Sequence, residues 1–174
     1  MKQPIIKPIA MACTMLVMCF SVVFGSSAFA LESDADQPIT IDSDTATYDD
    51  AAEISTYTGK VVSTQGSIRV ESDKLVVYLK KGDAEKLIFV GKPAKFKQTP
   101  SQGGEDIKGE ALTGEYYPKQ KLLVLIDQAS VTQGNAMYTS QLIEYDIKSS
   151  LVKAGEKSSG SKRVHAILKP RKEK

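Results

Sequence analysis

The chain contains no tryptophan, one histidine and only two cysteines among its 174 residues. Both cysteines, Cys13 and Cys19, lie near the amino terminus, so the rest of the chain has no thiol. The lone His165 without a cysteine beside it excludes the common His- and Cys-ligated zinc sites and argues against a nucleophile–histidine pair. No pair of carboxylates stands out as catalytic. The sequence therefore predicts a protein with no catalytic residues, no metal site and no cofactor.

Two segments resemble ligand-binding loops but lack residues that those loops require. Asp42, Asp44 and Glu53 occupy acidic positions of a calcium-binding loop, yet Thr47 stands where the sharp turn needs glycine. Residues 155–162 contain Gly, Ser and Lys but reverse the Lys-Ser order of a phosphate-binding loop. We reject both motifs; weak cation binding by the acidic stretch stays open.

The first thirty residues have the pattern of a secretory signal peptide. Lys2 and Lys7 precede an apolar run over residues 9–24, and the small-x-small pattern of Ala28-Phe29-Ala30 follows. The run is shorter than the roughly 20 residues that span a bilayer. We expect export and cleavage after Ala30. A membrane anchor and a lipoprotein acylated at Cys19 are the alternatives.

Cleavage would change the charge and the cysteine count. Loss of Lys2 and Lys7 leaves 21 basic and 21 acidic residues and removes both cysteines. A net-neutral chain is not expected to bind nucleic acid as a basic protein does. Residues 31–53 carry eight acids and no base, whereas residues 148–174 carry nine bases and two acids. Such opposed ends are either solvated surfaces or complementary contacts with another molecule.

Short strands are predicted along almost the whole remaining chain. Period-two alternation or apolar β-branched runs mark seven segments, namely residues 39–42, 67–71, 74–79, 86–90, 94–97, 121–126 and 163–168. Turn residues separate them, at 65–66, 81–83, 91–93, 100–104, 118–119 and 134–135. No window has a clean helical period. The fold class is therefore all-β.

A loose internal repeat accompanies the strands. Residues 62–66 (VSTQG) recur as residues 130–134 (SVTQG), and each copy is followed by a small residue, a leucine and a tyrosine. Stacked repeats need a cap or another molecule at each end, and no helical cap is evident here. Exposed terminal strands favour pairing with another chain. The pattern thus predicts head-to-tail assembly, which propagates unless it closes into a ring.

The alternating strands place aliphatic residues on one face. A closed core is the default interpretation; a narrow apolar groove between two sheets is the alternative. On this face we take the candidate groove residues to be Ile39, Ile41, Ile68, Val70, Leu75, Val77, Phe96, Leu123 and Leu125.

Five ordered segments resemble the LptA/OstA family of periplasmic lipopolysaccharide-transport bridge proteins. They are residues 36–44, 57–68, 72–77, 91–96 and 109–116. The resemblance implies an open, twisted β-jellyroll of two facing antiparallel sheets, with Ile39, Phe96 and Tyr116 at groove-facing positions. Tyr117-Pro118 and residues 149–163 depart from the family pattern, so groove positions after Tyr116 are less well defined.

The family also implies partners and a role. Lipid A acyl chains would slide through the groove of a passive conduit, stacked with copies of itself, with an inner-membrane-anchored partner of related fold and with the N-terminal domain of an outer-membrane assembly barrel. We expect a signal peptide over residues 1–30, an OstA-like domain over 31–168 and a basic tail over 169–174. Two other functions stay open: a structural or adaptor module that oligomerises without carrying lipid, and a glycan hydrolase that uses a carboxylate pair.

Overall fold

The structure, a computed structural model, describes residues 34–100, 105–155 and 163–170. The predicted leader, its cleavage site after Ala30 and residues 171–174 of the predicted tail lie outside the described residues. Within the part that is described, no helix is long and apolar enough to cross a membrane.

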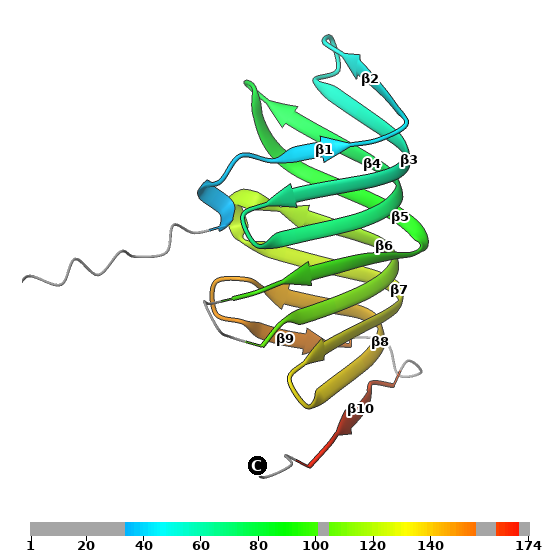
Figure 1. Ribbon diagram of the computed structural model, residues 1–174, viewed down its shortest axis with the longest axis vertical. Coiled ribbons are helices and arrows are strands. Elements are labelled where there is room, and N and C mark those ends of the chain that lie inside the picture. The colour runs from blue at the N-terminus through cyan, green and yellow to red at the C-terminus, as the bar shows by residue number, and fades with distance from the viewer. Residues whose placement is uncertain (1–33, 101–104, 156–162, 171–174) are drawn as a thin grey trace, which may run out of the picture. The chain divides into compact units, whose positions relative to one another are not determined.

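The described chain forms a ten-stranded antiparallel sheet, as Figure 1 shows. Its order is β1-β3-β4-β5-β6-β7-β8-β10, with β2 also paired to β3 and β9 also paired to β8. The prediction of an all-β fold is confirmed. The only helical elements among the described residues are two short 3₁₀ helices. The elements are η1 (Asp34–Asp36), β1 (Thr40–Asp42), β2 (Thr45–Asp49), β3 (Ile54–Gln65), β4 (Ile68–Lys80), β5 (Asp83–Gln98), β6 (Ile107–Tyr117), η2 (Pro118–Gln120), β7 (Leu122–Gln133), β8 (Ala136–Asp146), β9 (Leu151–Ala154) and β10 (His165–Leu168).

A line of β-bulges bends this sheet along its middle. The pairing register shifts in the middle of five successive strand pairs, from β3–β4 to β7–β8. Bulges bend a strand and increase its twist, and the long strands curve at one side of Figure 1. We call the two parts half-sheet A and half-sheet B. Half-sheet A consists of β1, β10 and residues 61–65, 68–72, 94–98, 107–111, 129–133 and 136–140. Half-sheet B consists of β2, β9 and residues 54–58, 74–80, 83–90, 113–117, 122–126 and 142–146.

The predicted turn at residues 91–93 is wrong, because this segment is the bend of β5 and not a reversal of the chain. The segments predicted at 86–90 and 94–97 are therefore two halves of one strand, and 67–71 and 74–79 merge into β4 in the same way. Gly91 is required at this bend, since a Cβ there would lie 2.6 Å from the backbone nitrogen of Ala94. Glycine marks a bulge as readily as a turn, which explains the error.

The inward faces of the two half-sheets enclose one hydrophobic core. Eighteen residues form it, and they are apolar apart from two tyrosine hydroxyls. The rings of Phe96, in half-sheet A, and Tyr145, in half-sheet B, meet edge to face with centroids 6.1 Å apart. The two half-sheets thus face each other, in agreement with the predicted jellyroll.

The internal repeat holds at its turns but not beyond them. Gln65-Gly66 and Gln133-Gly134 both end a strand at a turn with a left-handed glycine. After the turn the copies differ: Leu75 is buried and Tyr78 is exposed, whereas Leu142 is half-buried and Tyr145 is fully buried. The β3–β4 and β7–β8 pairs carry the same bulge, but the leucine and the tyrosine lie one residue nearer the turn in the second copy, and a shift of one residue places them on the opposite face.

Candidate functional site

A cavity of about 730 Å³ opens between the half-sheets at the β1 end. Its apolar lining includes Ile39, Ile41, Tyr57, Val77 and Leu79, and polar residues of η1, of η2 and of the β4–β5 turn form its rim. The volume lies in the range of small-molecule pockets. We call this space the mouth cavity.

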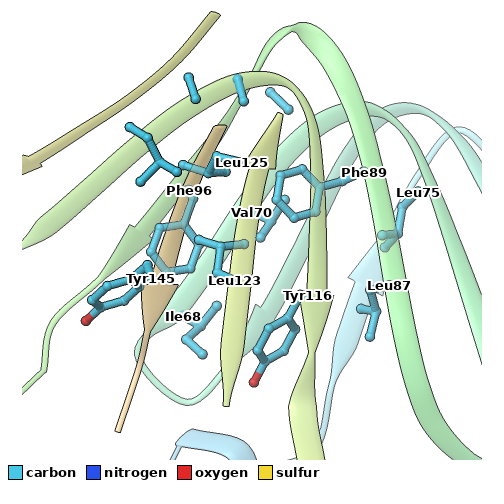
Figure 2. Packing of buried hydrophobic residues seen from close by; sticks show 14 of the residues in the cluster. Ile68, Val70, Leu75, Leu87, Phe89, Phe96, Tyr116, Leu123, Leu125 and Tyr145 are labelled. Atoms are coloured by element: carbon cyan, nitrogen blue, oxygen red, sulfur yellow. The ribbon is translucent and has the colours of Figure 1, made fainter. Parts of the chain in front are cut away.

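Beyond the mouth cavity the interior is closed. Ile68, Val70, Leu75 and Tyr116 surround a second space of only about 10 Å³. Phe96, Leu123 and Leu125 are buried in the core that follows, and Figure 2 shows these side chains packed among one another. The ten predicted groove residues therefore form a series: Ile41 and Val77 line the mouth cavity, Ile39 lines both spaces, Ile68, Val70, Leu75 and Tyr116 line the small space, and the other three lie in closed packing. Whether all ten contact a ligand stays a prediction.

Two tyrosine–glutamine hydrogen bonds join the half-sheets beside this interior. The Tyr116 hydroxyl donates to Gln65 Oε1 over 2.8 Å, and the Tyr145 hydroxyl donates to Gln98 Oε1 over 2.9 Å. Each tyrosine belongs to half-sheet B and each glutamine is the last residue of a strand in half-sheet A. Figure 2 shows both hydroxyls at the edge of the apolar cluster. We call the pairs Tyr116–Gln65 and Tyr145–Gln98 the clasps.

A third glutamine also lies at the end of a strand of half-sheet A, and its side chain donates a hydrogen bond to a backbone carbonyl beside half-sheet B. Gln133, the last residue of β7, donates from Nε2 to the carbonyl oxygen of Ser150 in the β8–β9 turn over 3.3 Å. Sequence reasoning used Gln65 and Gln133 only as part of a repeat and did not single out Gln98. The signal that would have found them is a glutamine at the end of alternate strands.

The short helix η1 holds the glutamine amides of both clasps. Gln65 Nε2 donates to the carbonyls of Ala35 and Gln37, and Gln98 Nε2 donates to Asp34 Oδ2. Asp34 also accepts hydrogen bonds from the amide and the hydroxyl of Ser67 at 2.7 and 2.8 Å. Because each amide nitrogen is engaged by η1, each amide oxygen is left to accept from its tyrosine.

Burial keeps both tyrosines protonated. Desolvation raises the pKa of Tyr116, and the nearby Asp34 carboxylate raises that pKa further. Desolvation likewise raises the pKa of Tyr145. Both hydroxyls therefore remain hydrogen-bond donors at neutral pH.

The outward-facing Tyr117 makes a different contact. Its hydroxyl donates to Glu115 Oε2, and Lys86 forms an ion pair of 2.8 Å with the other oxygen of that carboxylate. These three residues alternate outward with respect to Tyr116, so they contribute to the outer face of half-sheet B rather than to the interior.

The ends of the sheet carry exposed strands of unlike character. At one end, β2 and its turn present acids, including Asp49 and Asp50, beside the exposed Tyr48. At the other end, β10 is exposed throughout and Leu168 is 73% accessible. Among the described strands, β1, β2, β9 and β10 each pair on one side only.

The described residues bring together no group of three or more His, Cys, Asp or Glu side chains that could hold a metal ion. His165 lies exposed on β10, as a surface histidine. Asp42 and Asp44 lie at β1 and just after it, on the exposed end of the sheet.

Comparison with known proteins gives consistent matches. The family model described as LptA/(LptD N-terminal domain) LPS transport protein matches residues 40–151. The lipopolysaccharide export system protein LptH of Pseudomonas aeruginosa is 36% identical over 165 residues, covering 90% of this chain and 94% of LptH. The lipopolysaccharide export system protein LptA of Haemophilus influenzae is 34% identical over 158 residues, covering 89% and 90% of the two chains. The lipopolysaccharide export system protein LptA of Escherichia coli K12 is also 34% identical, covering 89% of this chain and 84% of the Escherichia coli protein.

The fold matches a solved structure as well. The crystal structure of Pseudomonas aeruginosa LptH, titled the LptA homologous periplasmic component of the conserved lipopolysaccharide transport device, superposes with a TM-score of 0.74 at 33% identity. The match covers 80% of this chain and all of the LptH chain.

Proposed function

The chain belongs to the family of LptA and LptD N-terminal-domain lipopolysaccharide transport proteins, and we propose that it binds lipopolysaccharide in the periplasm and passes it from the inner toward the outer membrane. The acyl chains of lipid A would enter between the half-sheets while the sugars and phosphates remain in water. The observation that carries the proposal is the mouth cavity between the half-sheets, whose lining includes Ile39, Ile41, Val77 and Leu79, in a chain whose relatives are named for lipopolysaccharide export.

Burial of hydrocarbon supplies the binding free energy. Each methylene removed from water contributes about 0.8 kcal/mol, and Ile39, Ile41 and Val77 offer aliphatic contacts of this kind. Such contacts are non-directional, so a chain can slide along them without breaking specific bonds. A conduit of this kind needs no catalytic group and no cofactor of its own, which supports a non-enzymatic role.

Exposed ends support stacking with other molecules. The acidic β2 end and the opposite end, which carries β10 and the basic residues Lys153, Arg163 and Lys169 of the described chain, are complementary in charge. We propose that copies of this chain stack head to tail, and that the terminal units contact an inner-membrane-anchored partner of related fold and the N-terminal domain of an outer-membrane assembly barrel. Cleavage of the leader after Ala30 would release each unit into the periplasm.

One observation favours the alternative role as an adaptor that carries no lipid. The interior at Phe96, Leu123 and Leu125 is filled by the protein's own side chains. A module of this kind would oligomerise through its ends and leave the core closed.

Replacement of Ile39 by aspartate separates the two roles. We expect Ile39→Asp to reduce lipopolysaccharide binding at least tenfold, because a carboxylate in the mouth cavity opposes burial of a hydrocarbon chain. The matched control is Val90→Asp, which places the same charge on the outer face of β5, where the side chain is 41% exposed. Binding of purified lipopolysaccharide to both folded variants is measured, with circular dichroism as the check on the fold. Equal binding by Ile39→Asp and wild type would contradict the groove, and absence of binding by the wild type would favour the adaptor.

A further inference from the structure

We propose that the two clasps, Tyr116–Gln65 and Tyr145–Gln98, form a gate between the mouth cavity and the interior, and that an acyl chain reaches the interior only when they part. This inference rests on the proposed function, because it assigns to specific residues the step by which the lipid moves inward. It names Gln65, Gln98, Tyr116 and Tyr145 as the residues that control this step.

The position of the first clasp supports the gate. Gln65 lines both the mouth cavity and the small space behind it, and Tyr116 lines the small space. The hydrogen bond between them therefore stands at the junction of the two spaces. Beyond it, the second clasp lies beside the packed core, since Tyr145 donates its hydroxyl to Gln98 and its ring contacts Phe96.

The closed interior makes an opening necessary. The inward-facing residues around and beyond the first clasp are each at most 6% exposed, namely Ile68, Val70, Leu75, Phe96, Tyr116, Leu123 and Leu125. No space for an acyl chain exists there unless the half-sheets separate or the core side chains rearrange. Because each clasp links half-sheet A to half-sheet B, separation of the half-sheets must break both hydrogen bonds.

The line of bulges supplies a place for the half-sheets to bend apart. At this line β3 contains Gly59 and Lys60, and β7 contains Asp127 and Gln128, all at positive φ. The register shifts at the same line in every pair from β3–β4 to β7–β8. The clasps lie at the opposite ends of the strands from these bulges, where a small change of angle produces the largest displacement.

Both clasps are hydrogen bonds between neutral groups, which makes them breakable. A neutral intramolecular bond has a modest net effect because water replaces it when it opens. The glutamine amides keep their bonds to η1 when the tyrosines leave, so the clasps can close again in the same geometry. The structure thus holds the interior closed with two hydrogen bonds that can break and form again.

The test uses a photo-crosslinking amino acid, p-benzoylphenylalanine, at two depths. The probe replaces Ile41, which lines only the mouth cavity, or Phe96 behind the first clasp, and crosslinks to purified lipopolysaccharide are quantified as the ratio of Phe96-site to Ile41-site product. We expect Tyr116→Phe and Tyr145→Phe each to raise this ratio about fivefold, which corresponds to the ~1 kcal/mol of one neutral hydrogen bond. Tyr117→Phe is the matched control, because it removes a neighbouring hydroxyl that contacts Glu115 outside the interior. Its ratio should equal that of the wild type.

A locked gate gives the opposite result in a single protein. Gln98→Cys and Tyr145→Cys are combined in a chain with Cys13→Ala and Cys19→Ala, and a reducible bis-thiosulfonate reagent links the two new thiols. We expect the link to abolish the Phe96-site crosslink and to leave the Ile41-site crosslink unchanged, and we expect reduction to reverse its effect. The same protein before and after reduction controls for any effect of the substitutions on folding.

The outcomes separate this inference from the proposed function. If wild-type protein crosslinks to lipopolysaccharide at both sites, but neither the Phe variants nor the lock changes the ratio, the gate is overturned and the function stands. If the wild type gives no crosslink at either site, the proposed function fails. The gate is then decided with the apolar dye N-phenyl-1-naphthylamine, whose uptake should increase in the Phe variants and decrease in the locked protein; unchanged uptake overturns the gate.

Discussion

Gly114 of β6 lies opposite Phe89 of β5, and the phenyl ring fills the space that a side chain at position 114 would need. The pair illustrates how single residues set the thickness of the interior. An aromatic ring packed over a glycine fills the core from one strand. Because the glycine has no side chain, the ring can lie close to the backbone of the neighbouring strand. Tyr116 and Tyr145 combine such a ring with a hydroxyl that reaches the opposite half-sheet.

Replacement of Gly114 by alanine tests this packing. The added methyl would overlap the Phe89 ring, so we expect the free energy of unfolding to fall by about 1–3 kcal/mol, as in other overpacked cores. Urea denaturation measures the change. The double variant Gly114→Ala/Phe89→Leu should recover part of the loss in a double-mutant cycle, because the smaller side chain makes room for the methyl. A strictly additive double variant would show that the two residues do not compete for the same space.

At the scale of single elements, η1 has an effect out of proportion to its three residues. Asp34 joins it to Ser67 in the β3–β4 turn and to Gln98 at the end of β5. The helix thereby fixes two strand ends of half-sheet A and orients the amides of both clasps. The bends at the bulges also act at this scale, because each one divides a long strand into a part in half-sheet A and a part in half-sheet B.

Loss of the Asp34 carboxylate should release η1. Hydrogen bonds to a charged acceptor contribute more than neutral ones, so Asp34→Ala is expected to lower the free energy of unfolding by about 1.5–3 kcal/mol. Hydrogen exchange at residues 34–40 and at Ser67 should accelerate, since the Ser67 amide donates directly to Asp34. Asp36→Ala, in the same helix but at an exposed position, is the control and should change neither quantity appreciably. Unchanged exchange in Asp34→Ala would mean that η1 is held by other contacts.

At the scale of the whole molecule, the sheet is open at both ends and closed along its interior. Long bent strands repeat from β3 to β8, and the four short strands at the ends each pair on one side only within the described chain. Unpaired edges are templates for further strands. The charge difference between the ends gives such contacts a direction.

Self-association should therefore depend on salt and on the terminal strand. Raising ionic strength from 0.1 to 1 M shortens the Debye length from about 10 to about 3 Å, so we expect head-to-tail oligomers to weaken several-fold. Leu168→Asp, at a side chain that is 73% exposed on β10, should weaken them at either salt concentration. Sedimentation velocity over a concentration series measures both effects, with Val90→Asp as the control on the outer face. Association that is indifferent to both changes would place the contact elsewhere.

Local patterns predicted much of this fold. Alternation and apolar β-branched runs identified seven segments, which lie in β1, β4, β5, β7 and β10; the specific segments did not include β2, β3, β6, β8 or β9. Ordered segments also predicted the family, which the family model and the relatives confirm. The error at residues 91–93 arose because glycine and proline serve a bend within a strand as well as a turn between strands.

The sequence by itself determined the all-β class, the strand periodicity, the apolar residues available for the interior and the opposed charges of the two ends, because each depends on residues that are neighbours along the chain. Only the tertiary structure decided which of those apolar residues line an open cavity and which are closed in the core. It also decided the clasps, since Gln65 and Tyr116, like Gln98 and Tyr145, are distant in sequence and meet only when the bulges fold the sheet onto itself. Alternation along a strand indicates which face of the sheet a residue occupies. The distance between the two facing half-sheets is set by the packing of side chains from both, which alternation does not record.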